Sequence, residues 1–162
     1  MEYSVRPLAD SETAYLDDFL YEAIFIPEGV EPPHRDIIKL PELQVYVEGF
    51  CTRDADIAYV AEVSGRIVGA VWVRIMDDYG HIDDTVPSLA ISLYKEFRSC
   101  GIGTALMSAM LGQLKARGYG KVSLSVQKQN YAVRLYRKFG FVTISENDEE
   151  YIMVCDLRKV AL

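Results

Sequence analysis

The segment from residue 88 to residue 126 constrains the fold most, because two β-type runs there enclose a glycine turn and a helical repeat. Ser88–Tyr94 is a β-type run, and Gly101–Arg117 repeats apolar residues at the spacing of one helix face. Lys121–Val126 then alternates apolar and polar residues, as a half-buried strand does. A strand, a helix and a second strand in this order predict a right-handed crossover that joins two parallel strands.

Shorter patterns on either side of this unit favour antiparallel strands. Further strands are expected at Tyr3–Leu8, Asp56–Val63, Arg66–Met76, Phe139–Ser145 and Tyr151–Leu157. Helices are expected from Ser11, a favoured N-cap residue, over Arg35–Phe50 with a break near Pro41, and from Asn130 to about Lys138. Together with the crossover, these elements predict an α+β (mixed α/β) class in a single domain, residues 1–162.

Half of the residues are hydrophobic and 25% are charged, as in ordinary soluble globular proteins. We expect no signal peptide, because charged residues interrupt the first ten positions, and no membrane partner, because no apolar run approaches about 20 residues. Cys51, Cys100 and Cys155 are odd in number and lack CxxC spacing, which disfavours a disulfide framework or a zinc site. A cytoplasmic protein without a metal is therefore expected, and a homodimer is left open.

The net charge of −7 conceals a basic segment. Lys95–Lys138 contains nine basic residues and one acidic residue, a net of +8, whereas the rest contains eight basic and 23 acidic residues, a net of −15. Helix surfaces explain part of this segment, since Lys115 and Arg117 suit the dipole at a helix C-terminus. A run this lopsided in an acidic protein also indicates a local anion site. The pI of about 4.8 and the lack of an aromatic–basic RNA motif disfavour a nucleic-acid partner.

The candidate anion site is the turn Arg98–Thr104, which reads Arg-Ser-Cys-Gly-Ile-Gly-Thr between a strand and a helix. Two glycines two positions apart let a backbone approach a ligand closely, and the following helix offers N–H groups that can bind phosphate. The spacing is neither GxGxxG nor that of a Walker motif, so nucleotide binding of those kinds is disfavoured. The alternative is a glycine pair that only permits a tight turn.

Two segments resemble the motifs of the GNAT superfamily of N-acetyltransferases. Leu93–Thr104 resembles the family's cofactor motif, in which Arg or Gln is followed by x-x-Gly-x-Gly or Ala. Asn130–Phe141 resembles its second motif, Asn-x-x-Ala-x-x-Leu-Tyr-x-x-x-Gly-Phe. The asparagine stands one place nearer the tyrosine than in the family, and Gln129 fills the usual position. Lys95 and Ser99 also depart from the family's frequent proline and glycine, without removing a needed amide.

The resemblance implies a predominantly antiparallel twisted sheet of about seven strands, with a splayed parallel central pair and about four flanking helices. It implies acetyl-CoA as the cosubstrate, with its pyrophosphate on the turn amides and its pantetheine arm along the backbone of Ile91 and Leu93. Asn130 would bond this arm, in addition to its role as an N-cap. The implied cofactor-binding residues are Ile91, Ser92, Leu93, Arg98, Ser99, Cys100, Gly101, Ile102, Gly103, Thr104, Asn130 and Tyr136.

Direct attack of a primary amine on a thioester needs a neutral amine, a stabilised oxyanion and a proton for the leaving thiolate. By resemblance, Tyr136 is the proton donor and the Leu93 amide is the oxyanion donor, whereas core packing is the alternative for Tyr136. The candidate base is Asp84, with Asp83, His81 or water as alternatives. Asp83-Asp84-Thr85 also suits simple turn chemistry.

The acidic residues outside the basic segment predict a cationic acceptor: a small amine, a lysine-like amine or an N-terminal amine. They recur in the segments expected to border the acceptor, namely Glu22, Glu28, Glu31, Asp36, Asp77, Asp78, Asp83 and Asp84. A cleft walled by one sign of charge concentrates the opposite ion, although such residues can also serve solubility alone.

Single aromatic residues are either core or pocket lining, and Trp72, Tyr21 and Tyr46 are candidates for an acceptor pocket. Cys100 is not expected to be a nucleophile, because the turn uses its backbone. The alternative function is a non-catalytic acyl-CoA-binding or sensor module on the same fold.

Overall fold

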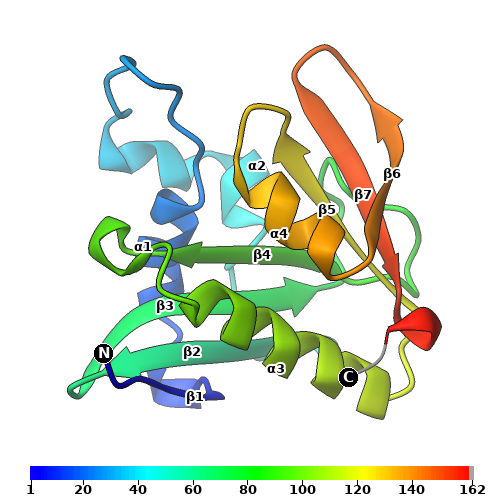
Figure 1. Cartoon of the computed structure of the whole chain (residues 1–162), viewed down its shortest axis with the longest axis horizontal. Helices are drawn as coiled ribbons and strands as arrows, with labels where there is room; N and C mark the ends of the chain where they lie inside the picture. The colour runs from blue at the N-terminus through cyan, green and yellow to red at the C-terminus, as the bar shows by residue number, and fades with distance from the viewer. Residues whose placement is uncertain (161–162) are drawn as a thin grey trace.

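A seven-stranded mixed sheet forms the centre of the protein, in the order β1-β2-β3-β4-β5-β7-β6 (Figure 1). The structure is a computed structural model that describes residues 1–160. The strands are β1 (Ser4–Pro7), β2 (Ile57–Val63), β3 (Arg66–Arg74), β4 (Ser88–Leu93), β5 (Lys121–Gln127), β6 (Phe141–Glu146) and β7 (Glu150–Asp156). Neighbouring strands are antiparallel except β4 and β5, which are parallel. The mixed sheet and the parallel central pair expected from the sequence are thereby confirmed.

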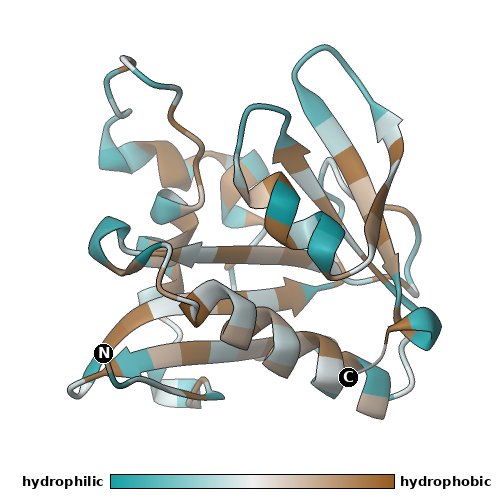
Figure 2. Cartoon of the chain, in the orientation of Figure 1, coloured by the Kyte–Doolittle hydropathy of each residue, from teal (hydrophilic) through white to brown (hydrophobic). Residues whose placement is uncertain are grey.

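Helices cover both faces of this sheet (Figure 1). Within residues 1–160 the α-helices are α1 (Tyr15–Glu22), α2 (Pro41–Gln44), α3 (Ile102–Ala116) and α4 (Ala132–Lys138). One hydrophobic cluster joins α3 to one face, and a second joins α1 to the opposite face of β2–β4. The strands are largely apolar, whereas the β6–β7 turn is hydrophilic (Figure 2). None of the described helices is long and apolar enough to cross a lipid bilayer.

The α3 helix begins and ends where the glycines allow it. Gly101 is its N-cap at a φ of 84°, and Gly118, at a φ of 87°, ends it in the left-handed conformation. Its apolar stripe is fully buried against the sheet, as the repeat in the sequence predicts. The buried residues of the stripe are Ile102, Leu106, Met107, Met110, Leu111 and Leu114.

The parallel pair β4–β5 is splayed. In the described part of the chain the two strands are in register at one pair, Ser88 and Ser123, and beyond it they diverge (Figure 1). The Tyr94 N–H donates to the Val68 carbonyl of β3, 3.0 Å away. Because backbone groups alternate along a strand, those of Ile91 and Leu93 face the opposite edge, toward β5. We call this opening between β4 and β5 the split.

One helical expectation was wrong, and a second was wrong in part. Ser11 does not cap α1, because Glu12 turns back to accept the Ala9 N–H at 2.8 Å and to pair with Arg6. The chain therefore makes a 3-10 turn at Asp10–Glu12, and α1 starts at Tyr15.

In the segment 35–50 the break near Pro41 occurs as expected, but the helical structure on either side of it is shorter than the sequence predicts. The segment holds a 3-10 turn, Arg35–Lys39, and the single helical turn α2, separated by the extended Leu40. Proline disfavours helical backbone in the residue before it and begins a new helix well, which accounts for this break.

Candidate active site

The turn Arg98–Thr104 has a backbone that can receive an anion. Ser99 and Gly101 have φ angles of 60° and 84°, and the first hydrogen bond of α3 runs from the Ala105 N–H to the Gly101 carbonyl at 3.2 Å. The amides of Ile102, Gly103 and Thr104 precede this bond, so the helix itself does not satisfy them. A Cβ added at Gly101 would meet no atom within 4 Å, so the space beside the turn is open. These features fit a pyrophosphate.

The turn, the end of β4 and α4 meet at Gly103. A Cβ added there would lie 3.6 Å from Leu135 Cδ2 and 3.7 Å from Leu93 Cδ1, which is ordinary van der Waals contact. The two sequence motifs, about thirty residues apart, thereby lie next to each other. Ile102 is fully buried and can offer only its amide, whereas Ser99, Cys100 and Thr104 are exposed.

The Arg98 side chain joins two elements. Its Nε donates to the Leu93 carbonyl at 3.0 Å and its Nη2 to the Glu22 carbonyl, the last residue of α1, at 3.4 Å. The Glu22 carboxylate is 3.8 Å from the same guanidinium. The Arg98 side chain therefore connects the end of β4 to the end of α1. The backbone of Arg98 forms the first residue of the turn.

Ser92 points away from the split. Its hydroxyl donates to the Phe19 carbonyl of α1 at 2.6 Å, and its backbone pairs with Ala70 of β3. The backbone groups available to a ligand in the split are therefore those of Ile91 and Leu93. Asn130 accepts the Ala132 N–H, at the first residue of α4, on its Oδ1 at 2.9 Å, so a ligand contact would use its Nδ2 group.

Tyr136 is buried on α4, with its ring 5.9 Å from the ring of Phe141, centroid to centroid. Within residues 1–160, His81 Nδ1 is the one fully buried side-chain nitrogen or oxygen without a hydrogen-bond partner. The Tyr136 hydroxyl has no described partner either, and the residue is 7% exposed. Burial raises the pKa of Tyr136, which keeps the phenol protonated and able to donate.

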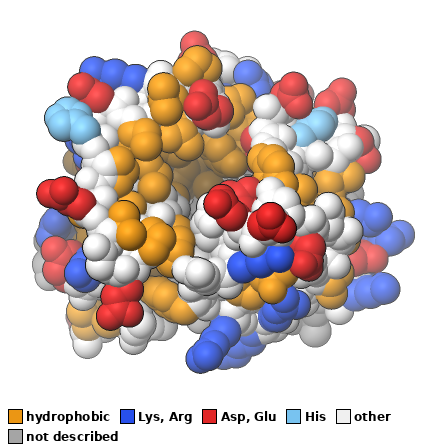
Figure 3. Space-filling model, turned by 90° about the horizontal axis from the view of Figure 1, so that it is seen from above, with side chains coloured by type: hydrophobic (Ala, Val, Ile, Leu, Met, Phe, Trp, Pro, Cys, Tyr) orange, Lys and Arg blue, Asp and Glu red, His pale blue; other side chains and the backbone are white. Residues whose placement is uncertain are grey.

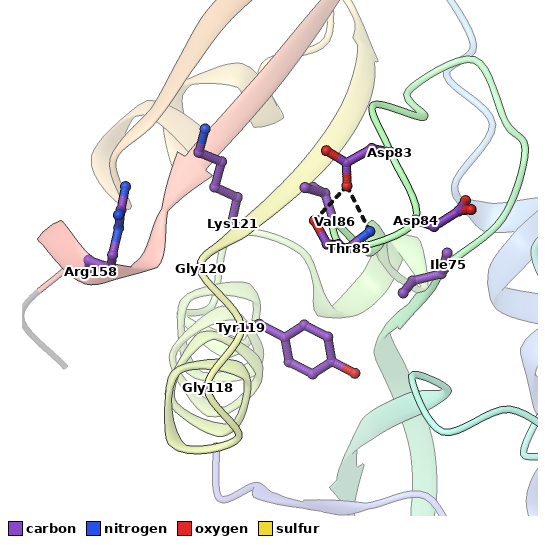
Figure 4. Close-up of a pocket in the computed structure, with 10 residues that line it drawn as sticks. All are labelled: Ile75, Asp83, Asp84, Thr85, Val86, Gly118, Tyr119, Gly120, Lys121 and Arg158. Carbon is purple, nitrogen blue, oxygen red and sulfur yellow. Dashed lines mark hydrogen bonds between the residues drawn. The ribbon is translucent and has the colours of Figure 1, made fainter.

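The candidate bases of the loop before β4 lie elsewhere. Asp83 and Asp84 line a cavity of about 510 Å³, together with residues 118–121 at the far end of α3 (Figure 4). Asp83 accepts the Thr85 N–H at 2.7 Å and the Thr85 hydroxyl at 2.5 Å, which is turn chemistry. The Asp84 side chain is 94% exposed and 3.6 Å from His81 Nε2. The structure therefore does not bring Asp84 to Leu93 and Tyr136.

A different acid of the same loop lies at the closed end of the split. Asp78 accepts the Tyr46 hydroxyl at 3.0 Å and the Ser88 hydroxyl at 2.9 Å. The indole N–H of Trp72 holds the Tyr46 carbonyl at 3.1 Å, which fixes the segment after α2 on the sheet. Sequence reasoning named Tyr46 and Asp78 separately, but no local signal reveals a contact between residues 32 positions apart.

A second cavity, of about 520 Å³, opens above the split. It is lined by Phe25 and Pro27 after α1, by residues 127–129 at the end of β5 and just after it, and by Asp148 and Glu149 of the β6–β7 turn. Seen from above, the molecule is hollowed at its centre, with hydrophobic side chains inside and acidic side chains at the rim (Figure 3). The sequence did not predict that acids of the β6–β7 turn would line this cavity. They reach it because β7 pairs with β5, a contact between segments that are separate in the sequence.

Comparison with known proteins identifies the family. A model of the acetyltransferase (GNAT) family matches residues 18–141. The chain is 36% identical over 106 residues to an acetyltransferase of Pectobacterium atrosepticum, covering 64% of this chain and 69% of that protein. It is 30% identical over 115 residues to an N-alpha-acetyltransferase of Sulfolobus acidocaldarius, covering 61% of this chain and 68% of that protein.

Solved structures agree on the fold. An N-acetyltransferase of Thermoplasma acidophilum in complex with coenzyme A superposes with a TM-score of 0.69 at 18% identity, over 96% of this chain and 99% of that one. The protein belongs to the GNAT family of acetyltransferases. It is an acyl-CoA-dependent N-acetyltransferase.

Proposed function

We propose that this protein moves the acetyl group of acetyl-CoA to a primary amine by direct attack, and that the acceptor is cationic. The observation that carries the proposal is the convergence of the open turn, the end of β4 at the split and α4, the helix of Tyr136, around Gly103. Acetyl-CoA supplies an activated thioester carbonyl. The protein then has to bind the pyrophosphate, orient the carbonyl and provide protons.

The residues of the site suit these tasks. The turn amides from Arg98 to Thr104 bind the pyrophosphate, and the backbone of Ile91 and Leu93 pairs with the pantetheine arm. The Leu93 N–H, which faces the split, stabilises the developing oxyanion. Tyr136 donates to the departing sulfur. Because a phenol is a weaker acid than a thiol by about 1.5 pKa units, this donation acts as the thiolate forms.

Direct attack is favoured over an acetyl-cysteine intermediate. Cys100 is exposed on the turn, where its Sγ lies 3.4 Å from the Arg98 carbonyl. A nucleophile at this place would meet the pyrophosphate of the bound ligand and not its thioester. The amine therefore has to attack the thioester itself.

The charge of the cavity above the split supports a cationic acceptor. Asp148 and Glu149 line it, and the loop after α1 that forms its other wall carries Glu28 and Glu31. Lys128 also lines it, but its charge is paired with Glu146 at 2.9 Å, so the acids predominate. Like charges around a cleft concentrate the opposite ion and repel anionic acceptors. A small amine, a lysine-like amine and a free N-terminus all meet this requirement.

The test is release of free thiol from acetyl-CoA in the presence of a panel of amines. We expect turnover with at least one cationic primary amine and none with a matched carboxylate that lacks the amine. A protein that binds CoA but releases no thiol with any amine would instead support a non-catalytic acyl-CoA sensor. The protonated, donor-competent Tyr136 speaks against that alternative.

A further inference from the structure

We propose that the Tyr46 hydroxyl, held by Asp78, takes the proton from the attacking amine. This inference deepens the proposed function, on which it rests. It assigns the base to a pair of residues that the two family-like motifs do not contain.

The first argument is position along the split. Asp78 binds Ser88, the residue at which β4 pairs with Ser123 of β5. The Tyr46 hydroxyl also lies close to Ser125, two residues further along β5. Because β4 and β5 are in register at Ser88 and Ser123, Ser125 is level with Ala90, next to Ile91. The phenol oxygen therefore lies beside the part of β4 along which a ligand that enters from the turn would extend.

The second argument is the face of the sheet. Tyr136 belongs to the hydrophobic cluster of the α3 face, whereas Tyr46 packs against the cluster of the α1 face. Val122, Leu124 and Val126 point to the α3 face, so the alternating Ser125 points to the face of Tyr46. The two tyrosines thereby flank the split from opposite faces. One can donate to the leaving sulfur while the other accepts from the incoming nitrogen.

The third argument is hydrogen-bond capacity. Tyr46 donates its one proton to Asp78, so its oxygen can only accept from a further partner, and an amine N–H is such a partner. Burial first, and then the charges of Asp78 and Glu150, raise the pKa of Tyr46, so the phenol stays neutral. A neutral phenol bonded to a carboxylate can pass a proton on. Besides Asp78, the charged group that faces the hydroxyl is Glu150 at the start of β7.

The proton balance is complete. The ammonium gives a proton to the Tyr46 oxygen while the Tyr46 proton passes to Asp78. The freed nitrogen lone pair attacks the thioester carbonyl carbon, the C–N bond forms, and the C–S bond breaks with its electron pair on sulfur. Sulfur takes the Tyr136 proton. Solvent removes the second proton from the nitrogen and the proton on Asp78, and it restores Tyr136.

The experiment compares Tyr46→Phe and Asp78→Asn with wild type on two probes. The probes are N-acetyl-lysine amide, with an amine pKa of about 10.4, and trialanine amide, whose N-terminus has a pKa of about 7.8. Thiol release is followed from pH 6.5 to 9.5, and CoA affinity is measured by calorimetry. Asn at position 78 can still accept the Tyr46 bond but cannot take a proton, so it separates positioning from proton transfer.

We expect both variants to keep CoA affinity and to lose about 100-fold in kcat/KM for the amine at pH 7. The loss in kcat/KM should become smaller as the pH rises, because more of the amine is then neutral before it binds. For trialanine amide, which has the lower amine pKa, this decrease should begin at a lower pH than for the lysine amide. Tyr79→Phe removes an exposed hydroxyl of the same loop, bonded to Asn147, and should stay near wild type.

A loss below threefold, or a loss of the same size at every pH, would overturn the assignment. So would a larger loss from Asp84→Asn than from Asp78→Asn. A wild type inactive on both amines would overturn both proposals, whereas an active wild type with unaffected variants would overturn only this one.

Discussion

Leu93 shows how a single residue can belong to the core and to the site at once. Its carbonyl accepts from Arg98, its N–H faces the split, and its side chain lies beside Gly103. On the neighbouring strand, a Cβ at Gly69 would lie only 2.9 Å from two carbons of Leu93. Glycine at position 69 is therefore what lets Leu93 occupy this place, and the oxyanion donor we propose depends on it.

At the turn, we expect Gly101→Asp to weaken CoA binding at least tenfold. The change adds a negative charge beside the amides and a side chain at a φ of 84°, a conformation that L residues rarely adopt. Calorimetry with CoA measures the affinity. Gly118→Asp, at a φ of 87° and equally open, imposes the same strain at the other end of α3 and should keep the affinity. A Gly101→Asp variant that folds and binds CoA with wild-type affinity would show that the pyrophosphate does not bind at this turn.

For Tyr136→Phe we expect unchanged CoA affinity and a fall in kcat of about 10²-fold or more, because only the proton donor is lost. Since burial raises the Tyr136 pKa, the hydroxyl is protonated throughout the neutral range and should add no ionisation to the pH profile there. Tyr131→Phe, an exposed tyrosine of the same segment, is the control. A change in kcat smaller than threefold would leave Tyr136 with a packing role only.

Among the elements, β4 and β5 matter most for the proposed ligand site, because they pair at one position only and leave the split between them. β5 pairs with β7 over its whole length, from Lys121 to Gln127, whereas it meets β4 at one register pair. The inner edge of β4 therefore presents backbone groups that an extended ligand can use as a neighbouring strand would.

We expect CoA to slow amide hydrogen exchange at Ile91 and Leu93 more than at Tyr94, whose N–H already donates to Val68. The reason is that only the first two amides face the split. Exchange followed by NMR with and without CoA measures this difference. Equal protection at all three residues would indicate global stabilisation and not pairing in the split.

The sequence predicted those elements whose formation depends on residues close together in the chain. The apolar repeat and the flanking glycines give α3, and Asn130 accepts the N–H of Ala132, where α4 begins. The base that we propose could not be predicted in this way, because nothing in the local sequence distinguishes Asp78 from Asp83 and Asp84. Only the tertiary contacts of Asp78 with Tyr46 and Ser88 distinguish it. The Ser11 cap failed for the same reason, since the Arg6–Glu12 pair reshapes the chain there.

The whole molecule separates its charges. The basic segment runs through the turn, α3 and α4, whereas acids predominate in the remainder of the chain and at the mouth of the cavity above the split. Two of its basic side chains form ion pairs with described residues, Lys128 with Glu146 at 2.9 Å and Arg98 with Glu22 at 3.8 Å. An anionic cosubstrate and the cationic acceptor that we propose would therefore be drawn toward different parts of the surface.

We expect a cationic amine to be acetylated with a higher kcat/KM than a matched amine that carries a carboxylate. The preference should shrink as the salt concentration rises from about 10 mM to 1 M, because the screening length falls from about 30 Å to 3 Å. Steady-state thiol release at the two salt concentrations measures it. Equal kcat/KM for both amines at low salt would mean that the acids serve solubility alone.

Because the split offers a ligand unpaired backbone groups, the stability of the folded chain, and with it the abundance of the protein, should depend on the concentration of acetyl-CoA. A ligand that completes the pairing of β4 binds the folded chain and not the unfolded chain, so it raises the free energy of unfolding, by about 2.7 kcal/mol at a concentration one hundred times Kd. Differences of 1–2 kcal/mol change the steady-state abundance of a protein several-fold, because proteases remove unfolded chains. At a low concentration of acetyl-CoA, the steady-state amount of the enzyme that consumes it would fall.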